Sequence, residues 1–335
     1  MKRYNNLFIQ VTDFKNIHSA YLKTRKRKKC VKKILIFNFN LERNLLGIKK
    51  ELVLQNYKHG KYNEFFVCDS KKRRIKAPCF KDRVIHRSLC NIVEPVFDKS
   101  FISDSYACRI NKGTHKGVKR LKLFLKDNKN DYCLKCDISK YFDSINHNIL
   151  NNLIKKKIKD NKTLWLIGEI IKSNNCNSLN RGIPIGNLTS QLFANIYLNE
   201  LDQFVKHKLK QQKLIRYMDD FLILGNKNDL KIVKKFIGYF LNKKLNLQFN
   251  PKKANIFPVL RGVDFLGYVI FKNYILLRKS TVKRFLRKIK VSENIERIII
   301  AWFAYSKHAN SYFLRKKLVL FNCKQNKRTV YIKTN

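Results

Sequence analysis

Hydrophobic residues recur along the 335-residue chain with two spacings, one typical of helices and one of strands. The helical spacing predicts helices over residues 81–97, 114–125, 139–154, 164–171, 190–204, 230–241 and 280–290. Shorter apolar runs predict strands over residues 62–80 around a turn at 71–74, and over 132–138, 214–218, 221–224, 245–249, 263–271 and 274–277. The chain therefore mixes helices with short strands, and its sequence shows no internal repeat.

Acidic residues stand at two of the predicted strand ends. Asp137 lies at the carboxyl end of one strand, and Asp219 and Asp220 form the tip of a hairpin. Adjacent carboxylates repel each other and the apolar residues around them cannot neutralise them, so we expect a cation there. If the two strands are neighbours, three carboxylates meet, which favours two Mg²⁺ ions and phosphoryl transfer. Taken alone, an Asp-Asp turn is more often an ordinary exposed hairpin.

The charge balance indicates the kind of partner. The chain has 73 Lys and Arg residues against 23 Asp and Glu, a formal net charge of +50, while 44% hydrophobic residues allow a folded core. Because Lys and Arg neutralise phosphates and release counterions, the excess predicts a nucleic acid partner. Codon bias explains abundant Lys, Asn and Ile but not the scarcity of acids. No apolar stretch approaches the roughly 18 residues of a spanning helix, and residues 1–10 lack a signal peptide's apolar core, so we expect no membrane partner and a cytoplasmic protein.

The nine cysteines are scattered, which predicts reduced thiols in a chain without an export signal. One close pair, Cys133 and Cys136, lacks a second pair of Cys or His at zinc-site spacing. Packing within a buried strand is therefore favoured over metal binding.

Two segments concentrate the positive charge. Residues 23–33 carry eight basic side chains, and the helix predicted at 280–290 has one apolar and one basic face. Such runs are usually solvated, but in this chain both are candidates for contact with a nucleic-acid backbone. The candidate contacts are Lys26, Arg27, Lys28, Lys29, Lys283, Arg284, Arg287 and Lys288.

Several segments, taken in order, resemble the polymerase core of reverse transcriptases. They are FKDRVIH at 80–86, SYACR at 105–109, DISKYF at 137–142, YMDD at 217–220 and FLGY at 265–268. The resemblance covers roughly residues 60–290. It implies an α+β, right-hand polymerase with fingers, a palm built on a ferredoxin-like antiparallel sheet, and a small helical thumb. It also implies that Asp137, Asp219 and Asp220 are catalytic and that they bind the two Mg²⁺ ions together with Ile138.

The same resemblance gives the expected domain bounds. They are a basic N-terminal helical extension at 1–60, fingers at 61–130, a palm at 131–277 with a fingers-like helical insertion at about 151–181, and thumb and tail at 278–335.

The segment GIPIGNLTSQ at 182–191 indicates which subfamily of reverse transcriptases the chain resembles. In the usual reverse-transcriptase pattern Gln precedes the second Gly and Pro follows the Ser, whereas here Ile185 and Gln191 occupy those places. This variant resembles the reverse transcriptases of diversity-generating retroelements. Those enzymes copy a template repeat in an RNA into error-laden cDNA, altered mainly at adenines, which replaces a variable repeat in a target gene (mutagenic retrohoming). Since Ile185 cannot make the polar contact of the usual Gln, we expect low fidelity.

The resemblance further implies a nucleotide-binding set. Phe142 matches the aromatic residue that excludes a 2′-hydroxyl, although helical spacing equally allows plain packing. Lys253 matches a lysine near the leaving pyrophosphate, but the neighbouring Lys252 leaves the register open. His86 and His115 match family positions, where a structural imidazole is favoured. The full set is Arg73, Arg109, Phe142, Ile185, Gly186, Gln191 and Lys253.

Two alternatives remain open. Another bacterial reverse transcriptase, of retron or group II intron type, has similar motifs, but a retron enzyme more often keeps Gln at 185, and the roughly 45 residues after Lys290 leave no room for maturase-type C-terminal parts. A non-catalytic RNA-binding protein on a polymerase fold is disfavoured by the three intact acids. Expected partners are template RNA, a primer or cDNA strand, dNTPs and a small basic accessory protein that the RNA bridges, because a chain of charge +50 repels another basic protein.

Overall fold

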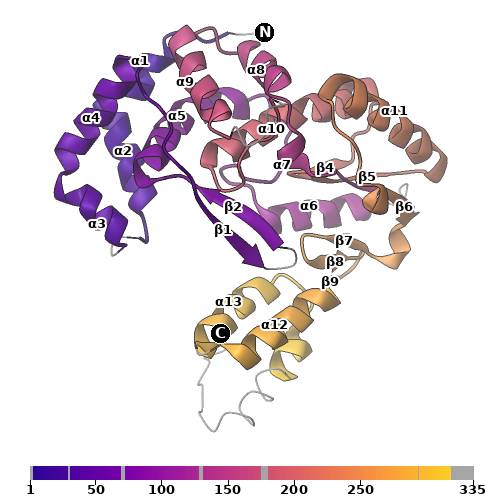
Figure 1. Ribbon diagram of the computed structural model, residues 1–335. Coiled ribbons are helices and arrows are strands. Elements are labelled where there is room, and N and C mark those ends of the chain that lie inside the picture. Colours follow the sequence, from indigo (N-terminus) through magenta and orange to yellow (C-terminus); the bar gives the residue numbers. More distant parts are fainter. Residues whose placement is uncertain are drawn as a thin grey trace.

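The computed structural model describes residues 3–28, 31–68, 72–127, 131–174, 180–292 and 294–317. At the N-terminal end, short helices pack around the long helix α5 (Figure 1). Val11 and Ile17 are fully buried there together with Val84 and Ile85 of α5, because the helices turn their apolar faces toward each other. The helices are α1 (Leu7–Thr12), α2 (Phe14–Arg25), α3 (Lys32–Phe39), α4 (Leu41–Val53) and α5 (Phe80–Asp98).

A two-stranded hairpin separates α4 from α5. Strands β1 (Asn63–Cys68) and β2 (Lys72–Ala77) pair antiparallel, with Phe65 opposite Ile75. In Figure 1 the hairpin reaches from the helices toward the C-terminal end of the fold. The turn predicted at 71–74 was wrong in its described part: residues 72–74 all belong to β2, and residue 71 lies outside the described residues.

The central sheet has the strand order β4-β5-β3-β6, with every neighbouring pair antiparallel. Strand β3 alternates its side chains between two hydrophobic clusters, so Cys136 packs in one and Cys133 in the other. Both thiols are fully buried and free, which confirms that the pair packs within a buried strand. The strands are β3 (Tyr132–Asp137), β4 (Leu214–Tyr217), β5 (Asp220–Gly225) and β6 (Asn255–Pro258).

Helices cover this sheet. The almost wholly buried α10 packs against α5, α8 and α11, while α11 contacts β3, β5 and β6 and α6 contacts β4. The helices are α6 (Thr114–Leu125), α7 (Tyr141–Ser144), α8 (His147–Lys155), α9 (Asn161–Lys172), α10 (Leu188–Gln203), continued by a π-helical turn (Phe204–Lys208), and α11 (Lys227–Leu245).

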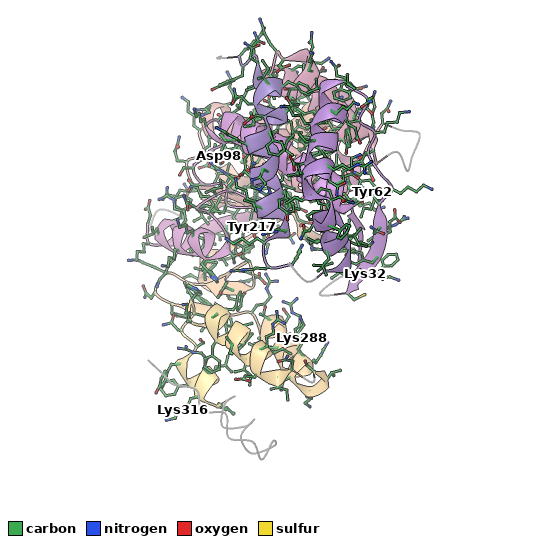
Figure 2. The ribbon with its side chains drawn as sticks, turned by 90° about the vertical axis from the view of Figure 1, so that its left-hand side faces the viewer. Lys32, Tyr62, Asp98, Tyr217, Lys288 and Lys316 are labelled. Atoms are coloured by element: carbon green, nitrogen blue, oxygen red, sulfur yellow. The ribbon has the colours of Figure 1, made fainter. Side chains whose placement is uncertain are left out.

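A small sheet and the helices α12 and α13 lie near the C-terminal end of the described chain. Phe285 of α12 stacks on Trp302 of α13, with ring centroids 4.1 Å apart. Figure 2 shows this C-terminal helix pair, with Lys288 labelled, below the part of the molecule that contains Tyr217. The elements are β7 (Val263–Phe265), β8 (Tyr268–Ile270), β9 (Ile275–Leu277), α12 (Lys279–Val291) and α13 (Ile295–Ser306), and two 3₁₀ turns precede them at Pro251–Lys253 and Val259–Arg261.

Three predicted elements were wrong. The helix at 139–154 is two helices, because the side chain of Asn146 accepts a hydrogen bond from the Ile149 N–H and starts α8 afresh. The strand at 245–249 does not form: α11 runs to Leu245, and the fourth strand of the sheet is β6. The apolar run 263–271 is itself a hairpin, β7 and β8, that turns at Leu266 and Gly267. Within the described part of the chain, no helix is long and apolar enough to span a membrane.

Candidate active site

The strand register brings the three predicted acids together. In the antiparallel pair β3 and β5, Asp137 lies directly opposite Asp220. Strands β4 and β5 are joined by a two-residue turn, in which Asp219 follows Met218 and precedes Asp220. Carboxylates that are far apart in the sequence therefore lie at one end of the central sheet.

Burial and mutual repulsion destabilise the ionised forms of these acids. Burial raises the pKa of Asp220 to about 6; Lys135 opposes this shift, and the carboxylates of Asp137 and Asp219 add to it. The pKa of Asp219 is also raised, again chiefly by burial. Oxygen Oδ1 of Asp220 is buried and accepts no hydrogen bond from any described residue. A cation would satisfy both the unpaired oxygen and the repulsion.

An ammonium group already neutralises part of this charge. Lys253 donates a hydrogen bond of 2.8 Å from Nζ to Oδ2 of Asp137, and Nδ2 of Asn250 donates to the same oxygen at 3.1 Å. Lys253 is half-buried beside this acid, whereas Lys252 is exposed. Sequence reasoning missed Asn250, although the Asn-Pro pair that opens this 3₁₀ turn is a recognisable signal.

The donor set fits a hard divalent cation. Among the described residues, no group of three or more His, Cys, Asp or Glu side chains is arranged as a ready-made metal site. Asp137 is instead held by Lys253, while burial keeps the pKa values of Asp219 and Asp220 raised although the charges of nearby lysines oppose the shift. Oxygen-only ligands suit Mg²⁺ among the divalent ions. Ile138, which the resemblance added to this set, is buried and forms a backbone bridge with Phe249.

The 182–191 segment joins the hairpin to α7. The N–H of Lys76 in β2 donates to the carbonyl of Ile185 at 2.9 Å, and the N–H of Ile183 donates to the carbonyl of Phe142 at 2.9 Å. Gly186 has φ +129°, and a Cβ atom there would lie 2.7 Å from the Lys76 carbonyl. Only glycine fits so close an approach. Phe142 is half-buried, and its backbone bond to Ile183 places it next to the 182–191 segment, which also contains Ile185.

The remaining nucleotide candidates separate into two groups. Gln191 is exposed on the first turn of α10, and Arg73 is exposed on β2, where its charge opposes the rise that burial causes in the pKa of Asp219. Arg109 differs: its guanidinium donates to Asp98 at 2.5 Å and to the carbonyls of Ile102 and Ser105. Arg109 therefore stabilises its own loop, and its donors are taken up there.

The two histidines are packed within the fold. His86 is fully buried and contacts the hydroxyl of Thr189 at 3.1 Å, and burial lowers its pKa to about 3. His115 stacks on His308 with ring centroids 3.6 Å apart. Both positions fit the expected structural role.

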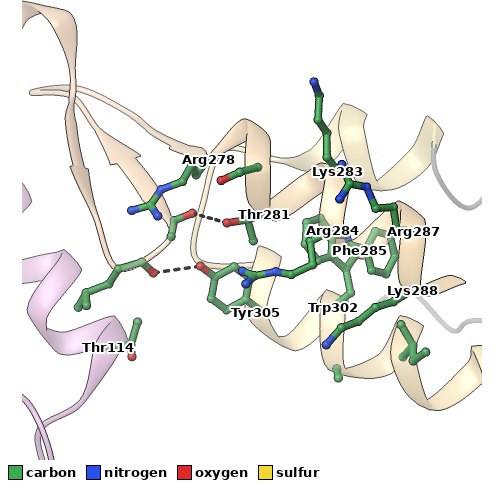
Figure 3. A pocket seen from close by; sticks show the side chains of 15 residues that line it. Thr114, Arg278, Thr281, Lys283, Arg284, Phe285, Arg287, Lys288, Trp302 and Tyr305 are labelled. Carbon is green, nitrogen blue, oxygen red and sulfur yellow. Dashed lines mark hydrogen bonds between the residues drawn. The ribbon is translucent and has the colours of Figure 1, made fainter. Parts of the chain in front are cut away.

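A basic cavity of about 830 Å³ lies at the C-terminal helix pair (Figure 3). It is lined by the four predicted cations of α12 and also by Arg278, which sequence reasoning missed. The hydroxyl of Tyr305 donates to the Leu266 carbonyl at 3.1 Å and so ties α13 to the β7-β8 turn. In the N-terminal basic segment Lys26, Arg27 and Lys28 are exposed, whereas Lys29 lies outside the described residues.

Comparison with known proteins identifies the family. The profile of "Reverse transcriptase (RNA-dependent DNA polymerase)" matches residues 57–270. Protein YkfC of Escherichia coli is 24% identical over 245 residues, which cover 61% of this chain and 64% of YkfC. Group II intron-encoded protein LtrA of Lactococcus lactis is 26% identical over 313 residues, covering 71% of this chain and 51% of LtrA. The chain thus spans less than two thirds of either relative.

The fold has solved counterparts. Apo telomerase from Candida tropicalis superposes with a TM-score of 0.51 at 14% identity, over 68% of this chain and 50% of the telomerase chain. This likeness concerns the fold and confirms the right-hand polymerase architecture with mixed helices and antiparallel sheets. From the matched residues 57–270, the chain belongs to the reverse transcriptase (RNA-dependent DNA polymerase) family.

Proposed function

We propose that the protein synthesises DNA on an RNA template, adding dNTPs to a primer 3′-hydroxyl by two-metal phosphoryl transfer. The observation that carries this proposal is the register that sets Asp137 opposite Asp220, with Asp219 in the adjoining turn. Their repulsion, their burial and the unpaired Oδ1 of Asp220 support a cation site at that point.

In this proposal Asp137, Asp219 and Asp220, with the backbone at Ile138, hold two Mg²⁺ ions. When bound, the ions would activate the attacking hydroxyl and offset the charge that develops on the triphosphate. Lys253 contributes from the protein itself: its ammonium, which lies 2.8 Å from Asp137, would neutralise the leaving pyrophosphate.

The proposed nucleotide pocket combines the hairpin, α7 and the 182–191 segment. Phe142 packs against the sugar and excludes a 2′-hydroxyl, while Ile185 and Gly186 shape the part of the pocket beside the nucleotide. The backbone bond from Lys76 to Ile185 supports a shared pocket, since it fixes the segment to β2. Arg73 of the hairpin and Gln191 of the 182–191 segment are both exposed, and in this proposal they contact the triphosphate and the base.

Basic surfaces hold the nucleic acid in this proposal. The cations of α12 and those after α2 contact backbone phosphates. The fingers, palm and thumb take the expected bounds of 61–130, 131–277 and 278–335. Template RNA and the primer or cDNA strand are the proposed partners, together with a small basic accessory protein that the RNA bridges; the cytoplasmic location stays a prediction.

The subclass rests on one position. Ile185, in place of the usual Gln, supports low-fidelity cDNA synthesis of the diversity-generating retroelement type. The relationship to LtrA supports a second candidate, another bacterial reverse transcriptase such as a group II intron or retron enzyme. An Ile185→Gln variant separates the two: in the first case its misincorporation opposite template adenine falls several-fold, because a polar contact worth about 1 kcal/mol is restored. Equal error rates would favour the second candidate.

Incorporation of labelled dNTPs on a primed RNA template tests the catalytic assignment. We expect activity from the wild type with Mg²⁺, and a loss of roughly 10³-fold or more in Asp219→Asn, which keeps the size but removes the charge of a metal ligand. Asp229→Asn, an exposed acid on α11, is the matched control and retains full activity. Equal activity of wild type and Asp219→Asn would end the catalytic assignment, and background incorporation by both would support a non-catalytic RNA-binding protein.

A further inference from the structure

A fully buried arginine lies behind the turn that carries Asp219. Arg216 of β4 and Asp202 of α10 are both 0% exposed, and Asn195 of α10 is 1% exposed. Nε of Arg216 donates to Oδ1 of Asp202 at 2.8 Å, and Nη2 donates to Oδ2 at 2.6 Å. Nη1 donates to Oδ1 of Asn195 at 3.1 Å and to the backbone carbonyl of Met218 at 3.0 Å. The arginine thus connects α10 to the turn.

This connection is more than an ordinary core ion pair. Burying two charges costs desolvation that their attraction only partly repays, so apolar residues would stabilise the same contact at least as well. What apolar residues cannot do is donate a hydrogen bond to the Met218 carbonyl. The arginine's position is therefore explained best by that bond.

The turn needs such support because of its backbone. Met218 has φ +59°, the left-handed region, at the first central position of a two-residue hairpin turn. Glycine is the preferred residue there, since side chains with a Cβ are strained in that region. A methionine in this conformation persists only where the surroundings hold it.

The held peptide leads directly to the carboxylate of Asp219. The peptide between Met218 and Asp219 accepts the Arg216 bond at its carbonyl, and its nitrogen is the backbone nitrogen of Asp219, one bond from the Cα that carries the carboxylate side chain. Arg216 is itself fixed through its backbone, because its N–H donates to the Asp104 carbonyl and its carbonyl accepts from the Tyr106 N–H, both at 2.9 Å. One rigid group therefore sets the plane of the peptide that orients the acid.

We propose that Arg216, clamped by Asp202 and Asn195, is a positioning residue: it fixes the Met218–Asp219 peptide and thereby the direction of the Asp219 carboxylate relative to Asp137. This inference rests on the proposed function. It assigns Arg216 a role in the reaction without contact with nucleotide, primer or metal.

The test uses two variants of the full chain. Arg216→Met combined with Asp202→Leu removes the bond to Met218 without leaving an unpaired buried charge. Arg216→Lys keeps the charge for Asp202, but one ammonium cannot reproduce the forked geometry that serves both the carboxylate and the carbonyl. The control is Lys156→Met with Glu200→Leu, which removes another ion pair of α10, at 3.0 Å, away from the turn.

Three quantities are measured on primed RNA: kcat per active site by active-site titration, KM for dNTP, and the Mg²⁺ concentration that gives half-maximal rate. For both variants we expect kcat to fall roughly 10- to 100-fold, because small displacements of catalytic groups have effects of that size. The Mg²⁺ requirement should rise several-fold, and KM for dNTP should change about twofold or less. The control should match the wild type in all three.

The opposite outcomes are distinct. A merely structural arginine would lower the thermal midpoint and the fraction of active molecules, with kcat per active site and the Mg²⁺ requirement unchanged, and this would overturn the proposal. If the double variant does not fold, the Arg216→Lys variant is sufficient: wild-type values of kcat and Mg²⁺ requirement in that variant overturn the proposal. An inactive wild type would refute the proposed function and this inference together, whereas an active wild type with unaltered variants would refute the inference alone.

Discussion

The chemical behaviour of individual side chains in this protein depends on the residues around them. Phe142 is half-buried beside the 182–191 segment, His86 is enclosed among α5 and α10, and Asp220 is buried next to two other acids. Each environment changes what the side chain can do. The ring of Phe142 limits the space beside it, the imidazole of His86 stays neutral, and the carboxyl group of Asp220 holds its proton more tightly. Two predictions follow from the first two of these environments.

Truncating Phe142 should weaken sugar discrimination. In Phe142→Ala the space beside the 182–191 segment opens, so incorporation of ribonucleotides relative to deoxyribonucleotides should rise roughly 10-fold or more. The ratio is measured with rNTP and dNTP pairs on one template. Ile149→Ala, another partly buried side chain packed on the same core, is the control and should leave the ratio unchanged. An unaltered ratio in Phe142→Ala would mean that Phe142 only packs.

His86 should make the free energy of unfolding depend on pH. Its pKa falls from 6.5 to about 3 on folding, so between these values the unfolded chain binds the extra proton. The contribution is therefore intact above about pH 6.5 and is lost at up to about 1.4 kcal/mol per pH unit as the pH falls toward 3. Urea unfolding at several pH values should show a flatter dependence in His86→Gln. His207→Gln, at an exposed position, should behave as wild type, and equal slopes for wild type and His86→Gln would contradict the prediction.

Secondary-structure elements place these groups in relation to one another. The hairpin β1-β2 is tied to the 182–191 segment, and α12 presents its cations around the cavity of Figure 3, where Phe285 also packs on Trp302 of α13. An amphipathic helix thus serves packing and charge display at once.

Neutralising α12 should reduce the number of phosphate contacts. With Lys283, Arg284, Arg287 and Lys288 changed to Gln, the slope of log K against log salt for a primed RNA duplex should become shallower by roughly 0.7 to 0.9 per lost contact. Affinity is measured by fluorescence anisotropy at several salt concentrations. The control changes the same number of exposed lysines on α11 to Gln, namely Lys231, Lys235, Lys243 and Lys244. If both sets shift the slope equally, α12 has no specific role.

The net charge of +50 acts on the molecule in its entirety. It attracts polyanions from any direction and opposes direct contact with another basic protein. If six to ten phosphates are contacted, RNA affinity should fall by roughly 10³- to 10⁵-fold between 50 and 200 mM salt. Titration of the full chain with RNA at both concentrations measures this, and sucrose in place of salt should have little effect. A salt-independent affinity would contradict an electrostatic origin.

Local features of this protein could be predicted from the order of its residues. The helices at 114–125 and 280–290, the acidic hairpin tip and the strand ending at Asp137 depend on spacing and turn residues within a few positions. The excess of positive charge and the family motifs can likewise be recognised from the sequence without the structure. Such features need only neighbours in the sequence, which is why they could be read without a fold.

Pairing between distant segments was decided only by tertiary structure. The register that sets Asp137 opposite Asp220, the contact of Lys253 with Asp137, and the use of β6 as the fourth strand all depend on which segments meet in space. Arg109 and Arg216 look alike in the sequence, yet one braces a loop and the other reaches the Met218 carbonyl. A side chain's partners come from residues far away along the chain, because burial and hydrogen bonding are satisfied in space and not in sequence.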